Sequence, residues 1–139
     1  MKQRVIMTIS FLLLITGLEN LSLAQILTPG QVESKTATGI RYFSGGVGED
    51  EQAMLSALGR SDNLKLVFAT REGHYLSDVA VVIKDSNGSQ VLAVVTDGPW
   101  LYTDLPAGKY VISATNQGET RQQTVRVTAG KQTQQYFYW

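Results

Sequence analysis

Apolar and polar residues alternate with a period of two from Leu64 to the end of the chain, in short runs broken by turn residues. Such alternation places successive side chains on opposite faces of a β-strand. Asn87-Gly88 and Asn116-Gln117-Gly118 are typical of the turns that join strands. The pattern predicts an all-β antiparallel sandwich of about seven strands. We expect these strands at 64–69, 79–84, 91–96, 100–103, 110–114, 124–128 and 133–139.

One stretch departs from the period of two and predicts a single short helix over Glu49–Leu58. Its first turn is acidic, which complements the helix dipole, and Gly59 follows its last residue as a stop signal. The apolar stripe expected on this helix consists of Met54, Leu55 and Leu58.

The first 24 residues have the layout of a signal peptide. Lys2 and Arg4 precede the apolar run Val5–Leu18, and Ser22-Leu23-Ala24 offers small residues for cleavage between Ala24 and Gln25. The apolar run is shorter than the ~20 residues that a membrane-spanning helix needs. We therefore expect a periplasmic or secreted protein that does not span the membrane.

The rest of the chain divides into two parts. Residues 25–44 mix Thr, Ser, Gly and Pro without periodicity and predict a flexible lead-in, in which Ile40–Phe43 is a candidate short strand. Residues 45–139 then form the β-sandwich domain, including the helix at 49–58.

The composition excludes several classes of function. Twelve basic residues balance twelve acidic ones, which argues against a nucleic-acid partner. Cysteine is absent and histidine occurs once, so thiol catalysis and the common zinc sites are excluded. We expect no cofactor and no bound metal.

Two stretches resemble the carboxypeptidase regulatory-like domain, a transthyretin-like β-sandwich with an immunoglobulin-like architecture. The resemblance covers about Leu64 to Trp139 and implies a fold, while that domain hosts many roles. The residues that carry it are Val79–Asp85, Gly88, Val91–Asp97, Leu105–Ile112, Gly118 and Val125–Gly130.

The second stretch also has a physical interpretation of its own. Pro106 fixes the backbone at a corner, Gly108 permits a close approach, and Tyr110 enters the next strand. The Tyr110 hydroxyl is expected to bond back to the corner backbone, as in a tyrosine corner. The alternative is a Pro-Gly loop followed by an ordinary core tyrosine.

A further similarity is to small exported proteobacterial proteins of no assigned activity. It is carried by Gly45–Glu51, Asn63–Ala69 and Gly98–Trp100. This resemblance implies a periplasmic module that stands alone.

Exposed aromatic side chains are the best candidates for a binding surface, because they bury much area at a small entropic cost. The last strand is expected to place Phe137 and Trp139 on one face and its tyrosines on the other, at an edge open to pairing with a partner. The candidate binding residues are Tyr75, Trp100, Tyr102, Tyr136 and Tyr138.

No catalytic residue is predicted. We interpret the chain as a non-enzymatic binding or accessory module whose partner is an envelope protein or a glycan. The alternative is a small periplasmic hydrolase in which His74 works with an aspartate at a strand end. Those aspartates are Asp78, Asp85, Asp97 and Asp104, and they lack the clustering of a calcium loop.

Overall fold

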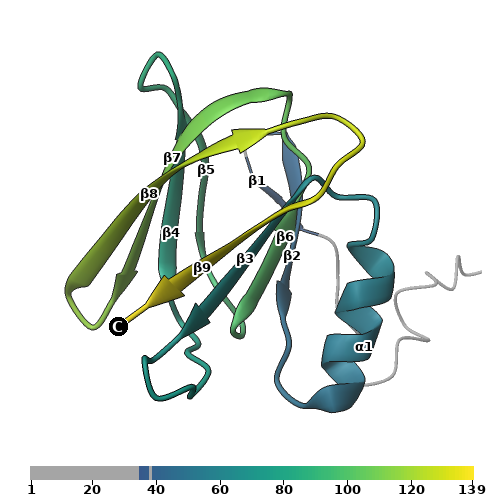
Figure 1. Cartoon of the computed structure of the whole chain (residues 1–139), viewed down its shortest axis with the longest axis vertical. Coiled ribbons are helices and arrows are strands. Elements are labelled where there is room, and N and C mark those ends of the chain that lie inside the picture. The colour runs from purple at the N-terminus through teal and green to yellow at the C-terminus, as the bar shows by residue number, and fades with distance from the viewer. Residues whose placement is uncertain (1–34, 38) are drawn as a thin grey trace, which may run out of the picture.

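The computed structural model describes residues 35–37 and 39–139, and these form two β-sheets packed face to face with one helix at the side (Figure 1). The all-β sandwich predicted from the alternation is confirmed. The predicted signal peptide at 1–24 and its cleavage site lie outside the described residues. Within the described part of the chain, no helix is long and apolar enough to cross a membrane.

The first sheet has five strands in the order β1-β2-β6-β3-β9. Its neighbours pair antiparallel except β3 and β9, which run parallel in the register Leu64↔Thr133 to Ala69↔Tyr138. The sandwich is therefore not wholly antiparallel. The bounds of its strands are β1 Lys35–Ala37, β2 Ile40–Gly45, β3 Leu64–Ala69, β6 Trp100–Thr103 and β9 Thr133–Tyr138.

The second sheet has four antiparallel strands in the order β5-β4-β7-β8. The tight turn of this sheet lies at Gln117-Gly118, where φ is 48° and 79°. At Asn87-Gly88 only the glycine has a positive φ, and the Asp85 carboxylate accepts the turn N–H groups of Asn87 and Ser89 instead. The bounds are β4 Ala80–Asp85, β5 Gln90–Val95, β7 Gly108–Asn116 and β8 Glu119–Val127.

The core lies between the two sheets and consists of the inward residues of each strand. Phe68 on β3 and Phe137 on β9 are fully buried, with ring centroids 5.7 Å apart. They belong to one apolar cluster that also contains Val81, Ile83 and Ile112 of the second sheet. This burial confirms that the apolar positions of the alternation face inward.

Helix α1 spans Glu49–Leu58, as predicted, and lies on the outer side of the first sheet beside β2 (Figure 1). Its single fully buried residue, Leu55, packs against Phe43 of β2 and Tyr102 of β6. Leu58, which we expected in the apolar stripe, is 43% exposed. The helix therefore touches the sheet along a narrower line than its sequence indicated.

The predicted lead-in at 25–44 needs a correction. Residues 35–37 and 40–45 form β1 and β2, which are paired to the sheet through β6, so the domain begins before residue 45. The candidate strand at Ile40–Phe43 is confirmed as part of β2. Because α1 covers the outer face of β2 and the core covers its inner face, Phe43 and Ser44 are both buried and the strand shows no alternation.

The tyrosine corner is confirmed. The Tyr110 hydroxyl donates a hydrogen bond to the Pro106 carbonyl over 2.5 Å, and the ring is buried. Burial, with Asp85 nearby, raises the pKa of the Tyr110 phenol, so the group stays a protonated donor.

Removing this one hydroxyl is expected to destabilise the domain. Tyr110→Phe leaves the Pro106 carbonyl without its donor and should lower the free energy of unfolding by about 1–2 kcal/mol. Urea denaturation measures the loss. Tyr75→Phe is the control, because Tyr75 is 55% exposed and its hydroxyl can bond to water. Equal stability of the two variants would contradict a structural role for the corner.

Candidate functional site

All five aromatic residues predicted as binding candidates lie on the outer face of the first sheet. Residues paired across neighbouring strands put their side chains on the same face, so the register of β3 with its neighbours defines three rows. The rows are Tyr102–Lys65–Gln134, Trp100–Val67–Tyr136 and Tyr75–Ala69–Tyr138. We call this set the aromatic face.

The loop after β3 brings Tyr75 into this arrangement. The chain turns back at Thr70–His74, where the Thr70 N–H bonds to the His74 carbonyl over 2.7 Å, and Tyr75 forms a bridge with Ala69. Tyr75 and Tyr138 therefore stand on either side of Ala69, a small residue that lies low between them. This turn therefore places Tyr75 on the outer face of the first sheet, and its role in binding stays a prediction.

The rings of the aromatic face differ in how far they are open to solvent. Tyr75, Tyr136 and Tyr138 are 55%, 43% and 47% exposed, whereas Tyr102 is buried beneath the end of α1. The rings of Tyr136 and Tyr138 are parallel, with centroids 6.0 Å apart. The expectation that Tyr102 is exposed is therefore wrong, and the other three tyrosines supply the accessible surface of the face.

A lysine sits among these rings. The Lys65 ammonium lies 3.7 Å from the Trp100 ring centroid and 5.3 Å from that of Tyr102, within the range of a cation–π contact. The Trp100 ring itself is half-buried and meets Tyr102 edge-on at 6.4 Å. Trp100 is therefore held in place on both sides, and Lys65 gives this end of the face a positive charge.

Strand β9 is the edge of its sheet, and two of its outward carbonyls already accept hydrogen bonds. Side chains of β8 cross from the other sheet and donate to its outward carbonyls: Gln123 Nε2 to Tyr136 O at 2.8 Å, and Arg121 Nε to Tyr138 O at 3.0 Å. The prediction that this strand is an edge is confirmed, and pairing with a partner stays a prediction. Two of the carbonyls that such a partner would use already accept side-chain hydrogen bonds. The predicted split of the strand is confirmed, since Phe137 packs inward while Tyr136 and Tyr138 point outward.

A hollow of about 450 Å³ adjoins the aromatic face at this edge, lined by Arg71, Arg121, Gln123 and Tyr138. Arg121 is fixed by its bond to Tyr138 O and by an ion pair with Glu119 at 3.1 Å. Among the described residues, no carboxylate lies within ion-pair distance of Arg71. The hollow thus combines an aromatic wall with two guanidinium groups.

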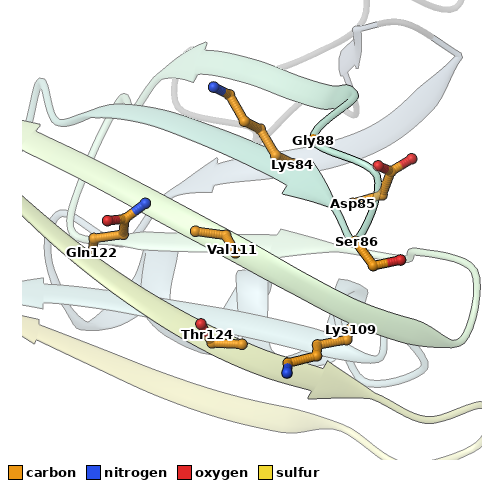
Figure 2. Close-up of a pocket in the computed structure, with 8 residues that line it drawn as sticks. All are labelled: Lys84, Asp85, Ser86, Gly88, Lys109, Val111, Gln122 and Thr124. Carbon is orange, nitrogen blue, oxygen red and sulfur yellow. The ribbon is translucent and has the colours of Figure 1, made fainter.

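A second hollow, of about 440 Å³, lies on the outer face of the other sheet near the Asp85–Gly88 turn. In Figure 2, Lys84 and Lys109 lie on opposite sides of this hollow, with Val111 between them. Its lining contains no aromatic ring, and the two ammonium groups do not converge on a common point. We regard the aromatic face as the better candidate site.

The hydrolase alternative requires His74 beside a carboxylate. His74 is on an exposed loop, and in the described part of the chain its imidazole has no hydrogen bond or ion pair. Asp62 is a buried carboxylate, and its burial raises its pKa against the opposing effect of Arg41. Its partner is the Arg41 guanidinium at 2.5 Å, which gives it a structural role.

Sequence reasoning missed the polar members of the site. Lys65, Arg71, Arg121 and Gln123 carry no motif, and they come together only through the pairing of β3 with β9 and the contact of β8 with β9. A basic residue at an outward position of a predicted strand was the sole signal in the sequence, and of these four residues it applied to Lys65 alone.

Fold and site together define a small β-sandwich module with an aromatic surface on one sheet. A model of the Rhizobiales growth-associated tandem repeat domain matches residues 62–135, more than half of the chain. The chain therefore belongs to this family. The match runs from the residues before β3 into β9 and includes Tyr75 and Trp100. A search of curated proteins found no match. The resemblance to the carboxypeptidase regulatory-like domain stays a prediction.

Proposed function

We propose that the protein is a non-enzymatic binding module of the cell envelope that holds a protein or carbohydrate partner on its aromatic face. The observation that carries this proposal is the alignment of Tyr75, Tyr136 and Tyr138 with Trp100 on one sheet face, with the three tyrosine rings 43–55% exposed. Exposed rings gathered on a rigid sheet are costly to leave in water, and they offer a large area that is already ordered for binding.

The location in the envelope is part of the same proposal. It is supported by the charged start, apolar run and small residues at 1–24. The family name links the domain to growth in Rhizobiales, and bacterial growth requires new envelope.

The aromatic face can be tested by removing its two most exposed rings. The double variant Tyr75→Ala/Tyr138→Ala is expected to lower the affinity for a purified envelope fraction about tenfold or more, since buried tyrosines dominate many interfaces. Co-sedimentation measures the bound fraction. Treating the envelope with protease beforehand separates a protein partner from a carbohydrate partner, because only the carbohydrate survives.

The control is the variant Val95→Ala. Val95 is 59% exposed and lies on β5 of the other sheet, away from the aromatic face. The control should bind like the unaltered protein. If the tyrosine variant also binds like the unaltered protein, the proposed function is wrong.

A further inference from the structure

We propose that the hollow beside Tyr138 binds an acidic group, so that the partner of the aromatic face is an acidic polysaccharide. This inference rests on the proposed function and names the class of partner. Tyr138 belongs both to the aromatic face and to the lining of the hollow. A ligand lying on the rings therefore reaches the two arginines without leaving the surface.

The two guanidinium groups give the hollow its preference for an anion. The N–H groups of an arginine match the oxygen atoms of a carboxylate or a phosphate and bind them strongly. Arg121 is held in position by its hydrogen bond to Tyr138 O and by its ion pair with Glu119. The Glu119 side chain is 67% exposed, so solvent screening weakens this ion pair. Arg71 has no acidic partner among residues 35–37 and 39–139. The hollow thus has positive charge that this part of the chain leaves uncompensated.

The edge of β9 favours a polysaccharide over an extended peptide as the partner. A peptide that adds a strand to a sheet pairs with the outward N–H and carbonyl groups of the edge strand. On β9, the carbonyls of Tyr136 and Tyr138 already accept hydrogen bonds from Gln123 and Arg121. A peptide strand added at this edge would first have to displace these two hydrogen bonds, while the rings remain free. Sugar rings need no such pairing, because their C–H faces stack on tyrosine rings.

The direct test uses oligosaccharides that differ only in charge. Oligogalacturonate carries carboxylates, and its methyl ester is neutral. Phosphorylated dextran oligomers and plain dextran oligomers form a second pair, which distinguishes a phosphate from a carboxylate. Binding is followed by the fluorescence of the two tryptophans, since Trp100 lies on the face and the Trp139 ring lies 5.8 Å from the Arg121 guanidinium.

We expect at least one acidic oligomer to bind about tenfold more tightly than its neutral form, and this preference should fall as salt is raised. Arg71→Gln should remove most of the preference. Arg126→Gln is the matched control, because Arg126 is an exposed arginine on β8 that does not line the hollow. It removes the same charge and should leave the affinity unchanged.

Equal binding of acidic and neutral oligomers, no binding of any oligomer, or equal affinities of the Arg71→Gln variant and the unaltered protein would each overturn the inference. Failure of the proposed function gives a different result: the Tyr75→Ala/Tyr138→Ala variant then keeps its affinity for the envelope fraction. If the partner is bound on the aromatic face but is not an acidic polysaccharide, that variant still loses affinity for the envelope fraction.

Discussion

Phe137→Ala is expected to lower the free energy of unfolding by about 3–5 kcal/mol, the range for removing a fully buried phenylalanine. Phe137 is 0% exposed and packs on Phe68 between the two sheets. A domain of this size has about 5–15 kcal/mol of stability in total, so the variant should retain at most a fraction of it. Urea denaturation monitored by tryptophan fluorescence measures the loss.

The neighbouring residue provides the control. Tyr138→Ala alters a side chain of similar size that is 47% exposed on the opposite face of the same strand, and it should cost about 1 kcal/mol or less. If Phe137→Ala leaves too little folded protein to measure, Phe137→Leu keeps most of the apolar volume and should show an intermediate loss. Equal losses at positions 137 and 138 would contradict the register of β9 on β3, and with it the placement of the aromatic face.

The two faces of β9 could be predicted from the sequence, whereas its register on β3 could not. The alternation within 133–139 was enough to divide its side chains between two faces, because a strand has only two faces and the apolar one turns inward. The alternation gave no information on which strand pairs with β9. The parallel pairing of β9 with β3 joins segments about half the chain apart, and local pattern carries no trace of such a contact.

Strand β2 shows a second reason why the sequence did not predict the whole fold. Apolar and polar residues alternate only where one face of a strand is buried and the other is exposed to solvent. Phe43 and Ser44 are buried on opposite faces of β2, because α1 covers one face and the core covers the other. The strand expected from the sequence therefore ended at Phe43, although β2 continues to Gly45, which pairs with Trp100.

The sequence likewise predicted only part of the candidate site. Each aromatic residue of the face was named from its residue type, yet their common surface depends on three separate pairings with β3. The arginines of the hollow were not foreseen. Arg71 follows β3 and Arg121 lies on β8 of the other sheet, so only the closure of the sandwich beside β9 brings them together.

Gly98→Ala is expected to destabilise the domain by about 3 kcal/mol or more, at the upper end for an overpacked site. A Cβ atom at Gly98 would lie 2.4 Å from both the carbonyl carbon and the carbonyl oxygen of Gly45. These are backbone atoms, so no side-chain rotation can relieve the clash, and β2 would have to move away from the start of β6. Trp100 pairs with Gly45 at this point, so its fluorescence should change as well.

Gly108→Ala is the matched substitution, because Gly108 also lies at a strand start and the nearest atom to its added Cβ is 3.8 Å away. It should leave the free energy of unfolding unchanged or raise it slightly, since alanine restricts the unfolded chain. Urea midpoints of both variants give the comparison. If Gly98→Ala is as stable as Gly108→Ala, the close approach of β2 to the Gly98 turn is not present in solution. The position of Trp100 on the aromatic face would then lose its physical basis, because the pairing of Gly45 with Trp100 depends on the same approach.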